Sequence, residues 1–245
     1  MNIALYGREA EKIRPLVERQ SALRIVETDP EIVVTFGGDG TLLAAERLWP
    51  GVPKVPIRNS RRGVRCIDEL PETVITALAN GRLVKREFLK LACDVEFTSK
   101  RRNPERILAI NEFSVHMGRV NSSVRFRMWF DGRPYEVGQD GEIIGDGFIV
   151  CTPFGSTAYF NQITRGEFWE GIGVAFLYTN QHTNHIIVPE ATEVRAVITR
   201  GPAVLAHDSA PDYIDLSDGD TLTIRRAQDH ATLLLPAETK LSPAQ

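Results

Sequence analysis

The sequence predicts an α/β domain built on a parallel sheet, followed by a β-rich domain. In roughly the first 80 residues, short apolar runs alternate with helical patterns, which is typical of parallel strands joined by crossover helices. After about residue 85 helical stripes become scarce, and short strand patterns separated by turns replace them. We place the domains at residues 1–85 and 86–245, with a tail that can return to the first domain. The cleft between the two domains is the default ligand site.

The expected elements of the first domain follow one another at short spacing. Apolar runs typical of buried strands occupy residues 3–6, 23–26, 31–36 and 55–57. Helical spacing of apolar residues occurs over residues 8–20, over 41–49 and around 74–78. Pro15 weakens the first of these helices, residues 49–51 (Trp-Pro-Gly) end the second, and Gly81 fits just past the third.

The second domain shows the period of two that half-buried strands require. Residues 124–130 alternate apolar and polar side chains, and Asp131-Gly132 then reads as a hairpin turn. Residues 148–151 form a continuous apolar run that suits a buried strand. Further strand candidates of the same kind are residues 185–188, 193–199, 203–206 and 221–224.

Composition narrows the class of protein. The 245 residues are 42% hydrophobic and 25% charged, with a formal net charge of −3, so no bulk electrostatic attraction favours nucleic acid or an acidic membrane. No stretch approaches about 18 apolar residues, and the N-terminus enters a strand pattern at once, so we expect neither a membrane span nor a signal peptide. Cys66, Cys93 and Cys151 lack metal spacing and predict buried thiols in a reducing compartment, which favours the cytoplasm.

Residues 33–43 are the most informative segment. They predict a buried strand, then the turn Gly-Gly-Asp-Gly at 37–40, and then the start of a helix. Glycines let the backbone approach a bulky anion, and the N–H groups at a helix start point toward phosphate. A carboxylate in such a turn repels phosphate, so Asp39 makes sense as a group that takes a proton from an attacking hydroxyl or helps to hold Mg²⁺. No lysine follows the last glycine and GxGxxG is absent, which excludes a Walker loop and a dinucleotide fingerprint.

Three further segments follow this loop in a fixed order. Residues 109–115 read Ala-Ile-Asn-Glu-Phe-Ser-Val, and residues 146–159 run from Asp-Gly to Gly-Ser-Thr-Ala-Tyr. A weaker match joins Ala-His-Asp-Ser at 206–209 to Asp-Gly-Asp at 218–220. Together with the GGDG loop, these segments resemble NAD kinases over roughly residues 31 to 225. The GGDG loop alone marks a wider group that includes diacylglycerol kinases and phosphofructokinases, whereas GSTAY with Asn-Glu is far more specific to NAD kinases.

The resemblance implies a role for each matching residue. Asp39 corresponds to the catalytic base that activates the 2′-hydroxyl of NAD. The loop residues expected to bind the donor phosphates are Gly37, Gly38, Gly40 and Thr41. The residues expected to bind NAD are Asn111, Glu112, Asp146, Ser156, Thr157, Ala158, Tyr159 and Asp208. These roles are chemically reasonable, because a ribose hydroxyl needs a positioned base and Tyr159 can stack on adenine.

The same resemblance implies the reaction and its cofactors. An NAD kinase transfers a phosphoryl group from ATP or polyphosphate to the 2′-hydroxyl of the adenosine ribose of NAD, which gives NADP. Mg²⁺ would be held mainly by the nucleotide phosphates, without a metal site made by the protein alone. The family also implies a homo-oligomer, a dimer or a tetramer, in which neighbouring subunits can contribute to a site.

Several of these residues also have ordinary structural interpretations. Asn111 and Glu112 could be surface residues at a strand end, residues 155–157 could be a turn with a helix N-cap, and Asp146 could belong to a simple turn. Four arginines form a basic cluster in one loop: Arg58, Arg61, Arg62 and Arg65. Arg58 and Arg62 are candidates for binding phosphates of the donor or product, and a solvated loop is the alternative.

Two segments depart from the family pattern near the expected substrate pocket. Residues 56–63 lack most of the glycines that usually surround a Gly-Ile-Asn segment, and residues 160–168 replace the usual Ser-x-x-Gly-Gly-Pro-Ile. The phosphotransfer residues are therefore better supported than the acceptor. Two alternatives to an NAD kinase stay open: a kinase of the same fold for a sugar, nucleoside or lipid hydroxyl, and a nucleotide-binding sensor without catalysis. An intact Asp39 argues against the sensor, which needs no base.

Overall fold

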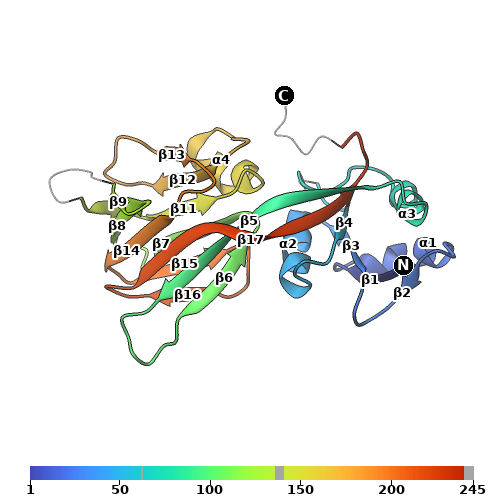
Figure 1. Ribbon diagram of the computed structural model, residues 1–245, viewed down its shortest axis with the longest axis horizontal. Helices are drawn as coiled ribbons and strands as arrows, with labels where there is room; N and C mark the ends of the chain where they lie inside the picture. The colour runs from blue at the N-terminus through green and yellow to red at the C-terminus, as the bar shows by residue number, and fades with distance from the viewer. Residues whose placement is uncertain (62, 136–140, 240–245) are drawn as a thin grey trace. The chain divides into compact units, whose positions relative to one another are not determined.

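The computed structural model describes residues 1–61, 63–135 and 141–239, and it confirms the predicted fold class (Figure 1). The chain forms two compact units. The first contains Met1–Phe88 together with the C-terminal residues from Asp229, and the second contains Leu89–Gln228. Two long strands, β5 (Val84–Glu96) and β17 (Thr221–Leu235), each contribute residues to both units.

The first unit is built on a parallel sheet, as predicted. Its strands lie in the order β2-β1-β3-β4, with the C-terminal part of β17 parallel to β4 where Leu233 faces Lys54. The bounds are β1 (Asn2–Tyr6), β2 (Arg24–Ile25), β3 (Ile32–Gly37) and β4 (Lys54–Arg58). The continuous apolar runs of this part of the sequence therefore correspond to buried parallel strands.

The helices of this unit differ from the prediction in one place. Residues 8–20 do not form one helix but a 3₁₀ turn, η1 (Ala10–Ile13), followed by the short α1 (Arg14–Glu18). Pro15 lies in the first turn of α1, where its missing N–H breaks no helical hydrogen bond, so the helix starts again there. The other two are α2 (Asp39–Leu48) and α3 (Pro71–Ala79), and Gly81 follows α3 with φ +63°.

A buried ion pair lies inside the first unit. The Lys54 ammonium group pairs with the Glu46 carboxylate and also donates a hydrogen bond of 2.6 Å to the carbonyl of Trp49. Both charged side chains are buried, with exposed fractions of 0% and 5%. The pair therefore ties α2 to the start of β4 at a place where water cannot replace either partner.

The second unit is a sandwich of two antiparallel sheets. One follows the order β10-β8-β14-β17, extended by β5, β6 and β9, and the other follows β13-β12-β11-β7-β15-β16. The first sheet adds β6 (Glu105–Ala109), β8 (Val124–Phe130), β9 (Arg133–Pro134), β10 (Ile143–Gly145) and β14 (Val194–Arg200). The second contains β7 (Glu112–Met117), β11 (Gly147–Cys151), β12 (Ile172–Leu177), β13 (His185–Val188), β15 (Ala203–His207) and β16 (Ile214–Leu216).

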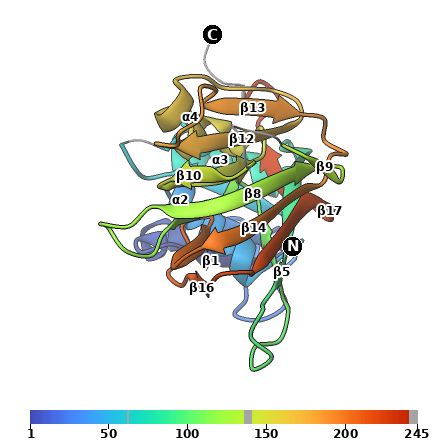
Figure 2. The same ribbon diagram turned by 90° about the vertical axis from the view of Figure 1, so that its left-hand side faces the viewer.

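The inward faces of both sheets share one core. Phe126 of β8 and Phe148 of β11 lie in it with ring centroids 4.7 Å apart. The outer face of the second sheet is covered by α4 (Tyr159–Thr164), which lies beside β12 and β13 in Figure 2 and packs Phe160 on Ile149. The predicted hairpin turn is confirmed, because Asp131 and Gly132 both have positive φ and join the paired strands β8 and β9.

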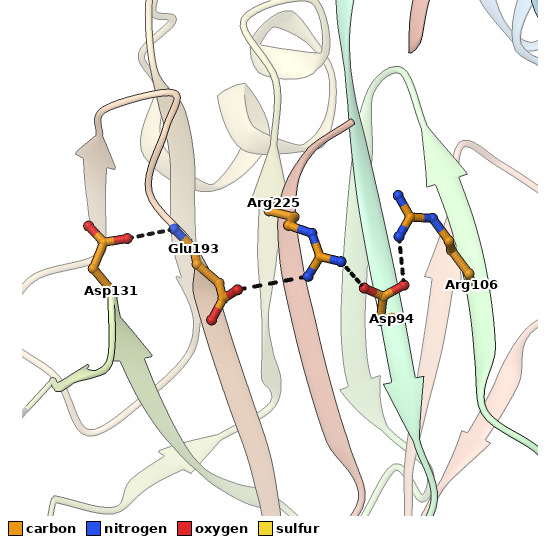
Figure 3. A network of polar contacts seen from close by, with 5 residues as sticks. All are labelled: Asp94, Arg106, Asp131, Glu193 and Arg225. Atoms are coloured by element: carbon orange, nitrogen blue, oxygen red, sulfur yellow. Dashed lines mark hydrogen bonds and ion pairs between the residues drawn. The ribbon is translucent and has the colours of Figure 1, made fainter. Parts of the chain in front are cut away.

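A line of charged side chains crosses the outer face of the first sheet of this unit (Figure 3). The Asp94 carboxylate accepts from Arg106 at 3.1 Å and from Arg225 at 2.5 Å, and Arg225 also lies 3.8 Å from Glu193. The Glu193 backbone N–H donates to Asp131 at 2.9 Å. Because these side chains are partly exposed, each pair contributes little to stability, but together they connect strands β6, β5 and β17, the residue before β14 and a turn.

None of the helices in the described part of the chain is long and apolar enough to cross a membrane. The three cysteines are buried and form no disulfide, as the sequence predicts.

The buried pair gives a test of the first unit. Lys54→Met should lower the free energy of unfolding by about 3–5 kcal/mol, because the Glu46 carboxylate would stay buried without its cation. Urea unfolding followed by circular dichroism measures the loss. A double variant, Lys54→Met with Glu46→Gln, should recover part of it, and a single variant as stable as the parent would contradict this account.

Candidate active site

The GGDG loop forms the junction of a strand and a helix, as predicted. Gly37 ends β3, Gly38 caps α2, and Asp39, Gly40 and Thr41 make its first turn. A Cβ on Gly37 would lie 2.2 Å from Oγ1 of Thr41, and one on Gly38 would lie 2.8 Å from Oγ of Ser60. Packing therefore favours glycine at 37 and 38, whereas Gly40 faces open space and its glycine is not required by packing.

The Asp39 carboxylate is held by the loop that follows β4. Its Oδ2 accepts the backbone N–H of Val64 at 2.9 Å, and its Oδ1 accepts that of Arg65 at 2.9 Å. The Cys66 thiol donates a weak hydrogen bond to Oδ1 at 3.5 Å, and burial raises the pKa of this thiol, with the Asp39 charge acting in the same direction. Oδ2 accepts one of these hydrogen bonds and keeps a further lone pair, and Asp39 is only half-buried, so a fixed acceptor remains available.

A pocket of about 390 Å³ opens beside this loop within the first unit. Gly40 and Thr41 line one side of it, and Gly7, Arg8 and Glu11 line the other. The N-terminal turn of α2 and the exposed Arg8 both favour an anion there. The sequence analysis missed Gly7 and Arg8. The available signal was their position just after a parallel strand, because the carboxyl ends of such strands share one edge of the sheet.

The predicted basic cluster is less available than the sequence suggests. Arg58 forms an ion pair with Asp68 and donates to the carbonyl of Gly63 at 3.3 Å. Arg65 is buried, whereas Arg61 is exposed. Arg62 lies outside the described residues. A phosphate role for Arg58 stays a prediction and would require sharing the guanidinium with Asp68.

In the second unit, Asp208 organises the start of β7. Its carboxylate accepts three consecutive backbone N–H groups: those of Ile110 at 2.7 Å, Asn111 at 2.8 Å and Glu112 at 3.2 Å. Asp208 is 2% exposed, and its backbone has a positive φ of 44°. The structure therefore places Asp208 behind Asn111 and Glu112, where it fixes their backbone.

Asn111 and Glu112 are buried and incompletely hydrogen-bonded. Neither Oδ1 of Asn111 nor Oε2 of Glu112 has a partner among the described residues, although both atoms are buried. Burial raises the pKa of the Glu112 carboxyl from 4.5 to about 8, and the charge of Asp208 acts in the same direction. A neutral Glu112 can both donate and accept, so the pair offers polar atoms suited to a ligand with hydroxyl or amide groups.

The Thr-Pro-Phe-Gly-Ser-Thr segment packs directly on this strand end. The Thr152 backbone N–H donates to the Asn111 carbonyl at 2.9 Å, and the Thr152 hydroxyl donates to the Ile110 carbonyl at 2.6 Å. A Cβ on Gly155 would lie 2.3 Å from the Asn111 carbonyl oxygen, which explains the glycine. Ser156 is fully buried, and its hydroxyl bonds the Pro153 carbonyl at 2.8 Å. In this arrangement Ser156 holds the turn, and half-buried Thr157 and Ala158 follow it.

Tyr159 lies on His116, a residue that the sequence analysis did not select. The two rings are nearly parallel, with centroids 5.7 Å apart. Burial lowers the pKa of His116, against the opposing effect of Asp146, and burial is also the main cause of the raised pKa of Tyr159. His116 shares a face of β7 with Glu112, because the two are four residues apart on one strand, and this period of two was the signal that could have found it.

A second pocket, of about 500 Å³, opens beside Tyr159 within this unit. Its lining includes Gln162 and Arg165 from the α4 segment, and Tyr178 and Asn184 from the loop after β12. The sequence analysis missed these four residues, although Gln162 and Arg165 fall within the segment that departs from the family pattern. The described residues hold no cluster of three or more His, Cys, Asp or Glu placed to bind a metal ion.

Residues 110–235, slightly more than half of the chain, match the family model described as the ATP-NAD kinase C-terminal domain. The chain belongs to the NAD kinase family. It is accordingly a kinase, a phosphotransferase. It is 28% identical over 236 residues to an NAD kinase of Chromobacterium violaceum, which covers 91% of this chain and 75% of that protein. It is 26% identical over 219 residues to an NAD kinase of Neisseria meningitidis serogroup B, which covers 85% of this chain and 71% of that protein.

Two solved structures share the fold of this NAD kinase family member. Yeast NADH kinase complexed with NADH has a TM-score of 0.85 at 16% sequence identity and covers 98% of this chain and 84% of its own. An NAD kinase from Archaeoglobus fulgidus in complex with ATP has a TM-score of 0.76 at 18% sequence identity. This match covers 97% of this chain and 95% of that chain. At these identities the similarity shows the fold alone.

The contacts of Asp208 predict that replacing one carboxylate oxygen by an amide nitrogen lowers the stability of the protein. Asp208→Asn keeps one acceptor oxygen but turns an amide NH₂ toward backbone donors, so we expect the free energy of unfolding to fall by about 2–4 kcal/mol. Urea unfolding measures this, with Asp215→Asn, an exposed site in the same unit, as the control. Equal stability of the two variants would show that the Asp208 contacts contribute little.

The raised pKa of Glu112 predicts a pH dependence of stability. Between 4.5 and about 8 the folded protein holds a proton on Glu112 that the unfolded chain releases, so the free energy of unfolding should fall as pH rises across this range. Glu112→Gln has no group to titrate and should lose this part of the pH dependence. Urea unfolding of both proteins at several pH values from about 5 to 8 tests it, and parallel pH profiles would contradict it.

Proposed function

We propose that this kinase transfers the γ-phosphoryl group of ATP to the 2′-hydroxyl of the adenosine ribose of NAD, which yields NADP and ADP. The observation that carries the proposal is the pair of buried oxygens on Asn111 and Glu112 that have no hydrogen-bond partner among the described residues. Buried acceptors without partners cost free energy, and a bound molecule that donates hydrogen bonds removes that cost. Ribose hydroxyls and the nicotinamide amide are donors of this kind, and the NAD kinases among the relatives have NAD as their acceptor.

Tyr159 supports a nucleotide at the same place. It presents an aromatic ring backed by His116, and adenine has a flat face that stacks on such a ring. Asp146 is half-buried near both rings and can accept from a ribose hydroxyl. We propose that the turn at 155–159 binds the nucleoside through Thr157, Ala158 and Tyr159, with Ser156 and Asp208 holding the backbone behind it.

Asp39 is the proposed base. Two backbone N–H groups fix its carboxylate, so a remaining lone pair can take the proton of the attacking hydroxyl without reorientation of the side chain. As the ribose oxygen forms its bond to the γ-phosphorus, the bond to the β-phosphate oxygen breaks and ADP leaves. The pocket beside Gly40 and Arg8 is the proposed place for donor phosphates, because the start of α2 and a cation favour anions there.

Mg²⁺ is proposed to enter with ATP. Asp39 is the one acidic residue of the GGDG loop, and the described residues make no multidentate cluster, so the nucleotide phosphates would supply most ligands, as Mg²⁺ prefers. When bound, the ion neutralises charge that develops on the phosphates. We further propose a cytoplasmic homo-oligomer of two or four subunits, for which the buried free thiols and the family resemblance are the support.

A second candidate, a kinase of the same fold for another hydroxyl, is favoured by one observation. Both segments that depart from the family pattern lie at residues proposed for the site: Asn59 of the first donates its backbone N–H to the Gly37 carbonyl at 2.7 Å, and Gln162 and Arg165 of the second line the pocket beside Tyr159. The deciding assay mixes purified protein, ATP, Mg²⁺ and NAD and detects NADP with an NADP-specific dehydrogenase. NADP formation supports the proposal. Its absence, with folded protein and with polyphosphate also tried, would move the proposal to another acceptor or to a sensor.

Asp39→Asn tests the base in the same assay. Because asparagine cannot accept the proton, kcat should fall on the order of 10²-fold or more, while NAD binding stays close to that of the parent. Asp29→Asn is the matched control, since Asp29 is exposed in the same unit and has a positive φ that asparagine tolerates. A rate for Asp39→Asn within a few-fold of the parent would remove Asp39 from this role.

A further inference from the structure

The pocket beside Tyr159 has an unusual balance of charge. Arg165 is the one cationic residue among the described residues that line it, and none of those residues is an aspartate or glutamate. The rest of the polar lining consists of side-chain amides and hydroxyls, including Gln162, Asn184 and Tyr178. Asp146 and Glu112 act on Tyr159 from nearby, but Glu112 is largely neutral near pH 7 because its pKa is about 8. The pocket therefore suits a molecule with one anionic group.

The Arg165 guanidinium group has no ion-pair or hydrogen-bond partner among the described residues, although its backbone is tightly held. The backbone N–H of Arg165 donates to the Asn161 carbonyl at 2.9 Å. Arg165 is the residue that ends α4, and its backbone lies in the left-handed region with φ 59°. The neighbouring Thr164 hydroxyl donates to the Phe160 carbonyl at 3.0 Å and accepts the Gly166 N–H at 3.1 Å. Arginine in this conformation is strained, and glycine would be easier there. An exposed cation on a backbone held in a strained conformation suggests a selected role for the side chain.

We propose that Arg165 is a specificity-determining residue that binds the phosphate attached to the nucleoside of the acceptor, so that the kinase selects nucleotides and dinucleotides over free nucleosides. A guanidinium can donate two parallel hydrogen bonds to a phosphate, which gives both affinity and orientation. Tyr159 begins α4 and Arg165 follows its end, so roughly 9 Å of helix rise separates them, which suits a base stacked at one end and a phosphate at the other.

This inference rests on the proposed function for the identity of the acceptor, and it assigns a reason to the altered segment at 160–168. The glycines, proline and isoleucine of the family pattern are uncharged, whereas the segment that replaces them here contains Arg165, so the change adds a cation to the pocket. The consequence is a gain of phosphate recognition by a side chain that the family pattern does not supply.

Equilibrium binding tests the proposal without requiring turnover. Calorimetric titrations of the full chain with adenosine, AMP and NAD would compare the parent with Arg165→Gln and Arg165→Lys. Arg127→Gln is the matched control, because it removes the same charge from an exposed position on β8, outside the site. Thermal unfolding of each variant confirms that it is folded.

We expect Arg165→Gln to weaken AMP and NAD by about tenfold or more, the effect of losing a charge-assisted hydrogen bond, and to leave adenosine within about twofold. Arg165→Lys should restore part of the loss, and Arg127→Gln should bind all three as the parent does. Equal weakening of adenosine and AMP, no change in either, or no binding of AMP by the parent would each overturn the proposal.

Different results would contradict the proposed reaction and the proposed role of Arg165. If NAD binding depends on Arg165 but no NADP forms, the inference stands and the proposed reaction falls. If NADP forms and Arg165→Gln binds NAD as tightly as the parent, the reaction stands and the role of Arg165 falls.

Discussion

The hydrogen bonds of the Asp208 carboxylate hold the part of the chain where we propose that the acceptor binds. The carboxylate gathers three consecutive backbone N–H groups at the start of β7, and the positive φ of Asp208 and Ser209 turns the chain so that the carboxylate faces them. An ionised carboxylate offers about four acceptor sites, enough for three N–H groups, whereas the single amide oxygen of asparagine offers two. The backbone at the start of β7 is therefore held by Asp208, whatever contacts the side chains of Asn111 and Glu112 make.

Further contacts extend from that strand end. The Asn111 carbonyl accepts the Thr152 N–H, and the close approach of Gly155 to Asn111 sets the turn that leads into α4. Tyr159 follows directly, with His116 beneath its ring. Disturbing Asp208 should thus displace the turn and Tyr159 as well as Asn111, because each of these elements takes its position from the one before it.

Asp39 and Asp208 show how two similar contacts serve different ends. Both carboxylates accept backbone N–H groups, but Asp208 is buried and committed to three, whereas Asp39 is half-buried and holds two. The difference in exposure leaves Asp39 with lone pairs that a substrate can reach. A buried aspartate such as Asp208 holds the backbone in place, whereas a half-buried one such as Asp39 is suited to proton transfer.

The sequence predicted the parts of this molecule that depend on local pattern. The strand-turn-helix of the GGDG loop, the alternation in β8 and the turn at Asp131 follow from backbone chemistry that a few residues specify. The long strand β5 was missed because its charged first half hides the alternation. The strand β12 was missed because Gly173 lies within its buried run and Gly171 lies directly before it. The contacts of Asp208 could not be read at all, since they join residues almost a hundred positions apart.

The positions of residues 56–63 and 160–168 in the structure indicate which property each departure from the family pattern can change. The first segment, residues 56–63, bonds the GGDG loop through the Asn59 backbone N–H, which donates to the Gly37 carbonyl at 2.7 Å. A backbone N–H does this for nearly any side chain, so sequence change there is compatible with the base role proposed for Asp39. The segment at 160–168 instead exposes Gln162 and Arg165 side chains to a pocket. Change at the first segment can leave the chemistry untouched, whereas change at the second alters the side chains that line the pocket. Divergence in this kinase is thus expected in acceptor recognition and not in phosphoryl transfer.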